Sequence, residues 1–517
     1  MRTIKILWVD DEIEVLRPHL LFLNEKGYET VTCTNGNDAI NRVASEIYDI
    51  IFLDEHMPGL SGMETLRRIK EIKPSIPVVM ITKSEEEDIM EAAIGSQIAD
   101  YLIKPVKPVQ ILHSLKKLLE QETFVTRQTT TTFRTEFSAI GDMISSADSF
   151  SKWTDVYRKL LFWQSELMRS TDEGMKEVLK MQETDANRAF YKFIEKNYLR
   201  WLSPESMERP LMSPSVMSKK VFPLIEKNKC LFFIVLDNMR LDQWSDMAAE
   251  MSSFYRIASE EIYMSILPTA TQYSRNALFA GLMPSTINDT TPEYWIKDHE
   301  EEGKNLFEDK LLGRQLQRAG ISCKWSYNKI NSESESNTVN EKLSQLLQND
   351  LNVLVYNFMD SLSHARTDVG LIREMTGDEA AWLSLTHSWF VHSPLIDLLR
   401  KLAEKRITVV ITTDHGAIRV QKPVKVVGDR QTSMNLRYKT GRNLDYNPRE
   451  IFEIKNPTQA GLPMTNISSR YIFARENDYL IYPNNFNQMA SFYKDTLQHG
   501  GISMQEMLIP VSVLEPL

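Results

Sequence analysis

The sequence predicts an α/β protein built from three parts, and three observations support this division. Residues 1–120 alternate strand-length apolar runs with helical periodicity, whereas residues 121–202 show helical periodicity and no convincing strand. Strand-length runs return in residues 203–517, where several of them end at an aspartate. We therefore expect a parallel-sheet domain, a central helical bundle and a larger, doubly wound α/β domain. The length of 517 residues agrees, because it exceeds what one hydrophobic core usually serves.

The first part, residues 1–120, has the pattern of a parallel sheet with helices on both faces. Its strand-length runs are KILWV, ETVTC, DIIFL, VVMIT and YLI. Helical periodicity lies between them, at residues 13–26 and from residue 36 onward. This alternation is typical of repeated βα units, so we expect the strands to run parallel.

The middle part, residues 121–202, predicts a helical bundle. Apolar residues recur with a period near 3.6 from Trp153 to Met168, and again from Phe190 to Trp201. A rigid spacer is the more ordinary role for such a bundle, and a ligand-binding bundle is the alternative. The proline-dotted stretch SPESMERPLMSPS marks the next boundary, after which residues 203–517 form the third part.

The composition excludes several classes of protein. The apolar and charged contents of 42% and 25% are ordinary for a globular protein, and the net charge of −10 argues against general polyanion binding. The longest apolar run, CLFFIVL, is too short to span a bilayer, so we expect no membrane insertion and a cytoplasmic protein. Cys33, Cys230 and Cys323 are widely spaced and provide neither a disulfide framework nor a zinc ribbon.

Polar side chains follow four of the strands predicted in the first part. They are Asp10, Asp11, Asp54, Thr82 and Lys104. The carboxyl ends of parallel strands meet at one edge of a sheet, so these side chains should converge. Three carboxylates close together need a cation, and Mg²⁺ suits their oxygen atoms. Asp54 would accept a phosphoryl group, Lys104 would bind its oxygens, and the Thr82 hydroxyl would follow the new charge.

Through VDDE, FLDEHMPGLSGME, MIT and YLIKP, the first part resembles the receiver domain of two-component response regulators. The resemblance implies a flavodoxin-like fold, phosphorylation of Asp54 by a sensor histidine kinase, and Tyr101 as the switch aromatic. It also implies that Mg²⁺ binds Asp11, Asp54 and the backbone carbonyl of His56, with Asp10 acting through water.

The same resemblance has consequences for the backbone and for assembly. It implies a cis peptide at Lys104-Pro105. Phosphorylation would favour a homodimer, formed through the helix after Ser84, the ADYLI strand and the last helix of the domain.

Three apolar runs in the third part end at chemically active side chains. These side chains are Asp237, Asp360, Asp414 and His415. A doubly wound sheet builds its site where such strands end. His364 lies four residues after Asp360, on the same face of a helix, and His499 precedes two glycines. Such acids and imidazoles suit two metal ions, with zinc as the first choice and Mn²⁺ as the second.

The stretch ILPTATQYSRNALFAG supplies a candidate nucleophile. Thr271 stands where a helix would begin, so its hydroxyl and the first backbone amides of the helix can face one phosphate group. Coordination to a metal would lower the pKa of the hydroxyl and make it nucleophilic. A simple helix-capping threonine is the alternative.

In their order along the chain, these residues resemble the alkaline phosphatase superfamily, and LDNMRLDQW, LPTATQYSRNALFAG and the HGG after Gln498 look most like its PglZ branch. The resemblance implies a metal-dependent α/β domain of alkaline phosphatase type over residues 203–517. One zinc would take Asp237, Thr271, Asp414 and His415, and the other Asp360, His364 and His499. A threonine nucleophile favours a phosphate ester.

A basic segment follows His415. Residues 419–449 contain eight lysines and arginines against two aspartates, and this segment could cap the metals or form a solvated loop. Basic side chains with interleaved tyrosines suit a short linear or cyclic oligonucleotide, and the PglZ resemblance also points to phosphodiesters. The substrate-binding residues that we expect are Arg275, Arg437, Lys439 and Arg442.

The combination of a receiver, a helical middle and a PglZ domain resembles response regulators associated with type IX secretion. We therefore expect a response regulator, phosphorylated on Asp54, whose dizinc domain hydrolyses phosphodiesters through Thr271. This activity would control the secretion. The alternative is a phosphorylation-dependent docking module for secretion machinery or a transcription factor such as a sigma factor, with weak or vestigial hydrolysis. No segment resembles a DNA-reading helix-turn-helix, so we expect no direct sequence-specific DNA binding.

Overall fold

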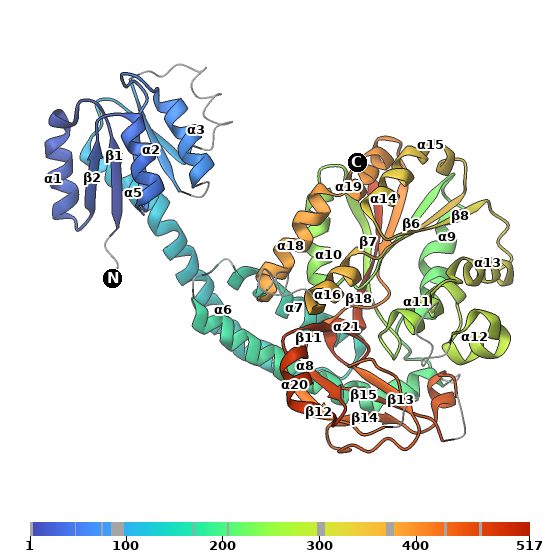
Figure 1. The fold of residues 1–517 in the computed structure, drawn as a ribbon. Coiled ribbons are helices and arrows are strands. Elements are labelled where there is room, and N and C mark those ends of the chain that lie inside the picture. The colour runs from blue at the N-terminus through green and yellow to red at the C-terminus, as the bar shows by residue number, and fades with distance from the viewer. Residues whose placement is uncertain are drawn as a thin grey trace. The chain divides into compact units, whose positions relative to one another are not determined.

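The computed structural model describes residues 4–46, 48–73, 76–83, 98–168, 170, 172–203, 206–296, 305–368, 377–428, 432–464 and 468–517. The chain forms two compact units (Figure 1). The first consists of Met1–Thr135 with Glu166–Met175, and the second of Glu136–Ser165 with Lys176–Leu517. No helix within the described residues has the length and apolar character needed to cross a membrane.

The first unit contains a five-stranded parallel sheet. Its strands are β1 (Lys5–Val9), β2 (Glu29–Cys33), β3 (Ile50–Asp54), β4 (Val78–Thr82) and β5 (Asp100–Ile103). Their order is β2-β1-β3-β4-β5, which confirms the flavodoxin-like topology. The helices are the 3₁₀ turn η1 (Ile13–Leu16), α1 (Arg17–Glu25), α2 (Gly36–Ser45), α3 (Gly62–Ile72) and α5 (Pro108–Leu115), which the π-helical turn η2 (Lys116–Glu120) follows.

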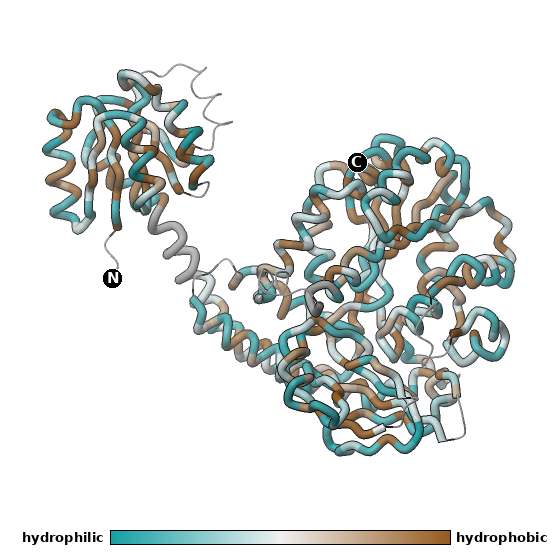
Figure 2. Tube along the Cα trace, viewed as in Figure 1, coloured by the Kyte–Doolittle hydropathy of each residue, from teal (hydrophilic) through white to brown (hydrophobic). Residues whose placement is uncertain are grey.

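Alternate residues of the strands pack into two separate hydrophobic cores, one on each face of the sheet. Leu7 and Leu53 pack against α2 and α3, whereas Trp8 and Phe52 pack on the opposite face with α1 and α5. Because both faces are covered, the inner strands β1, β3 and β4 are apolar apart from their end residues, and Figure 2 shows mainly hydrophobic colour along them. The predicted dimer face begins with the helix after Ser84, which lies outside the described residues.

The middle part is helical, as predicted. It contains α6 (Gln121–Ser146), α7 (Phe150–Met168) and α8 (Glu173–Leu202). Trp153 contacts Phe190 and Phe193, with ring centroids 5.3 Å and 5.9 Å apart, so the periodic aromatic residues join α7 to α8. Most of α7 and α8 belongs to the same compact unit as the third part, and this region is therefore more than a spacer between two domains.

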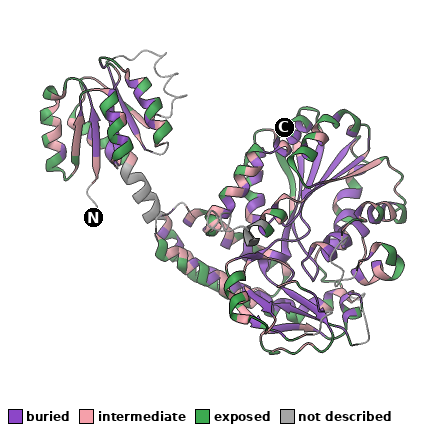
Figure 3. Ribbon diagram, viewed as in Figure 1, coloured by how far each residue is buried: buried purple, intermediate pink, exposed green. Residues whose placement is uncertain are grey.

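The second unit is built on a six-stranded mixed sheet. Its strands are β6 (Leu231–Leu236), β7 (Tyr255–Met264), β8 (Trp325–Ile330), β9 (Leu351–Tyr356), β10 (Thr408–Thr412) and β18 (Leu508–Pro516), in the order β7-β18-β10-β6-β9-β8. The four strands from β10 to β8 run parallel, and β18 is antiparallel to both of its neighbours. Figure 3 shows the four inner strands β18, β10, β6 and β9 as largely buried, whereas the edge strands β7 and β8 are more exposed.

Helices alternate with the strands of this unit along the chain, which confirms the predicted α/β class. They are α9 (Phe222–Ile225), α10 (Leu241–Met251), α11 (Thr271–Ala280), α12 (Pro284–Thr290), α13 (Glu308–Arg318), α14 (Glu333–Glu341), α15 (Leu343–Leu346), α16 (Phe358–Asp368), α18 (Glu379–His392), α19 (Pro394–Glu404), α20 (Phe486–Tyr493) and α21 (Met504–Met507). Short 3₁₀ or π turns are η3 (Ser213–Ser215), η4 (Met217–Val221), η5 (Pro292–Tyr294) and η6 (Pro457–Ala460).

A group of small sheets lies between β10 and β18 in the sequence. The pairs are β11 (Ile418–Arg419) with β17 (Leu497–Gln498) and β12 (Lys422–Lys425) with β16 (Asp478–Ile481). A three-stranded sheet has the order β13 (Tyr438–Gly441), β15 (Arg470–Ala474) and β14 (Ile451–Ile454). The basic segment after His415 is therefore the first half of a folded β region, in which Val424 and Ile451 belong to one core.

Candidate metal centre

Three neighbouring strands of the large sheet bring the predicted ligands to one edge. Asp237 follows β6, Asp414 and His415 follow β10, and Asp360 lies in the first turn of α16 just after β9. These strands stand side by side in the order β10-β6-β9 and run parallel. Their carboxyl ends therefore deliver all four side chains to the same place.

The six acidic and imidazole ligands fall into two groups of three. One group is Asp237, Asp414 and His415, and the other is Asp360, His364 and His499; in each, the ligand atoms lie within 4.8 Å of one another. The resemblance to the alkaline phosphatase superfamily implies this same division. The groups are adjacent, because the rings of His415 and His499 stack with centroids 4.2 Å apart.

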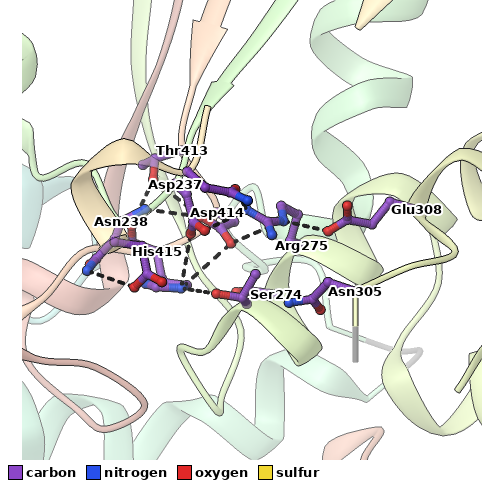
Figure 4. A network of polar contacts seen from close by, with 12 residues as sticks. Asp237, Asn238, Ser274, Arg275, Asn305, Glu308, Thr413, Asp414 and His415 are labelled. Carbon is purple, nitrogen blue, oxygen red and sulfur yellow. Dashed lines mark hydrogen bonds and ion pairs between the residues drawn. The ribbon is translucent and has the colours of Figure 1, made fainter. Parts of the chain in front are cut away.

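Two buried carboxylate oxygens in the first group make no hydrogen bond within the described residues. Asp237 Oδ1 and Asp414 Oδ2 accept no hydrogen bond from the described residues. The opposite oxygen of Asp237, Oδ2, lies 2.8 Å from Nη1 of Arg275 (Figure 4). Buried oxygens of carboxylates are normally satisfied, so this pair marks a position for a cation.

The two stacked imidazoles have the form that a metal requires. Burial lowers the pKa of His415 and of His499 to about 4, so both rings are neutral at pH 7. Nδ1 of His415 lies 3.2 Å from the carbonyl oxygen of Gly416, and Nδ1 of His499 lies 3.1 Å from that of Thr269. A ring whose Nδ1–H donates to a carbonyl keeps the lone pair on Nε2.

The Nε2 atoms point into the centre. Nε2 of His415 lies 3.6 Å from Asp414 Oδ2, and Nε2 of His499 lies 3.6 Å from Asp360 Oδ1. Burial, followed by the neighbouring Asp237, raises the pKa of Asp414 well above its ordinary range. A shared cation would relieve this repulsion, and neutral imidazoles with carboxylates are the ligands that zinc prefers. The residues present therefore fit a divalent metal.

Thr271 lies at this centre. It is the first residue of α11 and is partly exposed, while the rest of that helix is buried. Its Oγ1 atom is 3.0 Å from Nε2 of His415. The hydroxyl thus points at the first group of ligands, and the N-terminus of the helix is suited to holding a phosphate group beside it.

Asn238 is a part of the centre that the sequence reasoning missed. Its side-chain amide lies 3.4 Å from Asp360 Oδ1 and its backbone N–H lies 3.5 Å from Asp414 Oδ1, so it links the two groups. The residue adopts a left-handed backbone with φ of 65°, which asparagine tolerates better than most residues. An asparagine directly after a strand-ending aspartate was the available signal.

Two of the arginines predicted to bind substrate have other roles. Arg275 is buried between Asp237 and Glu308, whose Oε1 lies 2.6 Å from its Nε atom (Figure 4). Arg437 is also fully buried, and its Nη2 atom lies 2.6 Å from Oε2 of Glu506. The prediction is corrected for both residues, because internal carboxylates already bind their guanidinium groups.

Lys439 is also placed away from solvent. Its ammonium lies 4.4 Å from the ring centre of Tyr482, and burial lowers its pKa to about 7. This placement does not support contact with substrate. Arg442 is exposed at the end of β13, and its part in substrate binding stays a prediction.

The first unit carries the second predicted site. Asp10, Asp11 and Asp54 form a third group of possible ligands, with atoms within 4.8 Å of one another. Nζ of Lys104 lies 3.0 Å from Asp10 Oδ2 and 2.9 Å from Asp54 Oδ2. Burial raises the pKa of Asp54 against the opposing effect of Lys104, so a divalent cation would stabilise its ionised form.

The remaining receiver residues surround this cluster in the chain. Thr82 is buried at the end of β4, His56 is exposed two residues after Asp54, and Tyr101 in β5 is 42% exposed. The Lys104-Pro105 peptide is cis. The switch roles of Thr82 and Tyr101, and the contact of His56 with a metal, stay predictions.

Three segments of the chain match known protein families. Residues 216–514 match the family described as the BREX system PglZ alkaline phosphatase-like domain. The chain belongs to this PglZ family. Ahead of the PglZ domain, residues 123–202 match the PorX response regulator linker domain, and residues 6–128 match the response regulator receiver domain.

Individual relatives match about a quarter of this chain. The chain is 35% identical over 117 residues to the transcriptional regulatory protein ResD of Bacillus subtilis, which covers 23% of this chain and 48% of ResD. It is 32% identical over 139 residues to ZraR of Klebsiella oxytoca, covering 27% of this chain and 31% of ZraR. The chain thus spans half or less of the length of these relatives.

Solved receiver structures also match about a quarter of this chain. A CheY-like receiver domain protein from Methanospirillum hungatei is 25% identical, with a TM-score of 0.23, and the match covers 24% of this chain and 98% of that one. A two-component response regulator from Clostridium difficile is 29% identical, with a TM-score of 0.22, and the match covers 23% and 97%.

The family assignments fix the general chemistry of the two sites. A receiver domain implies a histidine kinase as partner and phosphorylation-linked regulation. A PglZ domain is alkaline phosphatase-like, which points to the hydrolysis of phosphoric esters. Domains of both kinds typically use divalent metals, in agreement with the three groups of carboxylate and imidazole side chains.

Proposed function

We propose that this response regulator is phosphorylated on Asp54 and that its PglZ domain is a dizinc phosphodiesterase with Thr271 as the nucleophile. The observation that supports the proposal most is the placement of Thr271. Its hydroxyl oxygen lies 3.0 Å from Nε2 of His415, in the first of two adjacent groups of ligands.

Each residue of the centre has a defined part in this proposal. Asp237, Thr271, Asp414 and His415 would hold one zinc ion, and Asp360, His364 and His499 the other. Bound zinc would lower the pKa of the Thr271 hydroxyl and stabilise negative charge on the phosphate oxygens.

The reaction proceeds in two displacements at phosphorus. Thr271 Oγ1 forms a bond to phosphorus while the bond to the first alcohol breaks and that alcohol leaves with a proton. Water then attacks the phosphothreonine, which restores the hydroxyl and releases the phosphomonoester. The N-terminus of α11, ten residues long, holds the phosphate oxygens through its first backbone amides.

The substrate we propose is a short linear or cyclic oligonucleotide. Lys425, Arg442 and Arg449 are exposed on the β region that follows His415, and they supply positive charge outside the metal centre. Basic side chains of this kind bind a phosphate backbone through contacts that depend on salt. As the resemblance to PorX-type regulators implies, we propose control of type IX secretion as the output.

The test compares Thr271→Val with Thr271→Ser and with Thr338→Val, which changes a partly exposed threonine in α14. We expect Thr271→Val to lower turnover of bis-p-nitrophenyl phosphate at least 100-fold, Thr271→Ser to retain part of it, and Thr338→Val to have no effect. Zinc per chain, measured by mass spectrometry, should stay near that of the wild type. Normal turnover by Thr271→Val would exclude it as the nucleophile.

A further inference from the structure

Helix α8, from the middle part of the chain, reaches the segment that carries Thr271. Tyr198 of α8 is fully buried, and its hydroxyl oxygen accepts a hydrogen bond of 2.8 Å from the backbone N–H of Leu267. Leu267 lies four residues before Thr271, in the connection from β7 to α11. Neither strand nor helix fixes this connection, so contacts of this kind determine where the nucleophile stands.

The same helix also reaches the segment that follows His499. Asn187 is 5% exposed, and its Oδ1 atom accepts a hydrogen bond of 2.9 Å from the backbone N–H of Met504. Its Nδ2 atom donates a hydrogen bond of 3.0 Å to the side chain of Gln505. The oxygen and the nitrogen of the Asn187 amide therefore both form hydrogen bonds with α21. This helix begins five residues after His499.

Between these two contacts the segments are joined by hydrogen bonds. Thr269 Oγ1 donates to the carbonyl oxygen of Gly501 at 2.9 Å and accepts from the N–H of Gly500 at 3.0 Å. The carbonyl oxygen of Thr269 faces Nδ1 of His499. A displacement of either segment is therefore passed to the other.

The segment that carries His415 contacts the backbone of α21. The backbone N–H of Gly416 donates to the carbonyl oxygen of Glu506 at 3.2 Å. A Cβ atom at Gly416 would lie 2.2 Å from the carbonyl oxygen of Gln505, so the two backbones touch only because residue 416 is glycine. Through Gln505, Asn187 thus also supports the segment of a ligand in the first group.

We propose that Asn187 and Tyr198 are positioning residues for the metal centre, and that α8 keeps the segments of Thr271, His415 and His499 in register. The inference rests on the proposed function and deepens it. Neither residue is placed among the ligands or at the nucleophile, so each acts only through the backbone groups that it binds. The general sensitivity of catalysis to small misplacements of reacting groups, on the order of 100-fold for 1 Å, makes the effect measurable.

The chain offers a matched control for Tyr198. Tyr255 is also buried, and its hydroxyl also makes one hydrogen bond to a backbone group, the carbonyl oxygen of Ile407 at 2.9 Å. It lies at the start of β7, whereas Leu267 lies beyond the end of that strand. Tyr198→Phe and Tyr255→Phe therefore delete equivalent buried hydrogen bonds, and only the first deletion touches the nucleophile segment.

Asn187 has a matched control in its own helix. Asn197 is 6% exposed, and its Nδ2 atom donates to the carbonyl oxygen of Phe193, within α8. Asn187→Leu and Asn197→Leu replace buried amides by apolar groups of similar size. Only the first removes contacts between α8 and α21, which keeps the test informative if Tyr198→Phe does not fold.

The experiment measures kcat and KM on bis-p-nitrophenyl phosphate, zinc affinity by chelator competition, and hydrogen exchange of peptides from residues 265–274 and 499–507, in the full chain. We expect Tyr198→Phe and Asn187→Leu to lower kcat by 10-fold to 100-fold with KM within twofold, and to speed exchange in both peptides. The control variants should match the wild type in kcat and in the exchange rates of both peptides. Their melting temperatures should be similar to those of the test variants, so that a general loss of stability does not explain the difference.

The outcomes separate the inference from the proposed function. Equal losses in the test and control variants, or unchanged exchange in both peptides, would overturn the positioning role. If the wild type hydrolyses no phosphodiester, the proposed function fails. In that case exchange and zinc affinity still decide the inference, because positioned ligands must bind zinc more tightly in the wild type than in Asn187→Leu.

Discussion

Nη1 of Arg275 lies 2.8 Å from Oδ2 of Asp237, and both side chains are almost completely buried. The same guanidinium binds Glu308. Oε2 of Glu308 also lies 2.9 Å from Nζ of Lys329. Arg275 is thus the cation that balances the carboxylates on the inner side of the metal centre. It also leaves Oδ1 of Asp237 facing the place where a metal would bind.

Replacing Arg275 with glutamine should therefore destabilise the metal-free second unit. Removing one partner of a buried ion pair typically costs about 3–5 kcal/mol, because the carboxylate stays buried without its cation. Thermal unfolding of the chelator-treated protein measures this loss. Arg314→Gln is the control, since its ion pair with Glu293 is exposed and worth about 0–1 kcal/mol. Similar melting temperatures for both variants would contradict the assigned role.

Glu183 of α8 should make stability depend on pH. Burial, and then the nearby Glu379, raise its pKa from 4.5 to about 8. Between these two values the folded protein holds a proton that the unfolded chain releases. The stabilisation of the folded state by this proton is therefore fully present below pH 4.5. It is lost as the pH rises to about 8, by at most about 1.4 kcal/mol per pH unit.

The variant Glu183→Gln should lack this dependence and should be more stable than the wild type at pH 8. Denaturant unfolding between pH 5 and pH 9 measures the difference. Glu177→Gln, at an exposed position of the same helix, is the control and should follow the wild type. A Glu183→Gln variant whose stability changes with pH as the wild type does would show that Glu183 titrates elsewhere.

Phosphorylation of the first unit should require both Asp54 and Lys104. Asp54→Asn removes the acceptor oxygen, and Lys104→Met removes the cation that lies 2.9 Å from it. With acetyl phosphate and Mg²⁺, we expect an alkali-labile, hydroxylamine-sensitive acyl phosphate in the wild type, none in Asp54→Asn, and at least a tenfold loss in Lys104→Met. Label that persists in Asp54→Asn would place the phosphoryl group on another residue.

Metal removal should destabilise the second unit, and added zinc should restore it. Three carboxylates, Asp237, Asp360 and Asp414, lie in two adjacent ligand groups and repel one another without a cation. Ligand binding at 100 times the dissociation constant stabilises a protein by about 2.7 kcal/mol. Melting curves with chelator, with zinc and with Mn²⁺ measure this gain. Asp414→Asn should lose most of the zinc-dependent shift, and an equal shift in this variant would mean that zinc binds elsewhere.

Hydrolysis and docking should be separable in cells. If hydrolysis produces the output, Thr271→Val and Asp54→Asn should both abolish type IX secretion, whereas Thr338→Val should leave it intact. Secretion that survives Thr271→Val but not Asp54→Asn would favour the docking function. Immunoblots must show equal amounts of each variant, because a loss of stability lowers abundance.

The metal centre could be predicted from sequence because the carboxyl ends of adjacent parallel strands meet. An apolar run that ends at Asp237 or Asp414 places its carboxylate at that edge whatever the loops do. The same logic predicted Asp10 and Asp54 in the first unit. Both sites therefore followed from local patterns of a few residues each.

The basic residues could not be predicted in this way. Whether Arg437 faces solvent or the protein interior depends on Glu506, which lies 69 residues later in the chain. Arg275 was also expected to bind substrate, and its partner Glu308 is 33 residues away. Long-range pairing of charges leaves no local signal, so composition alone suggested a substrate surface.

The placement of α8 determines where this protein can be divided. A fragment that starts at residue 203 would contain Thr271 and all six ligands, yet it would lack Tyr198 and Asn187 and would expose the apolar surface that α8 covers. A fragment that starts at residue 136 would keep these groups. Isolated effector preparations of the shorter kind would therefore understate the activity of the intact chain, and a lack of turnover in them would not argue against an enzyme.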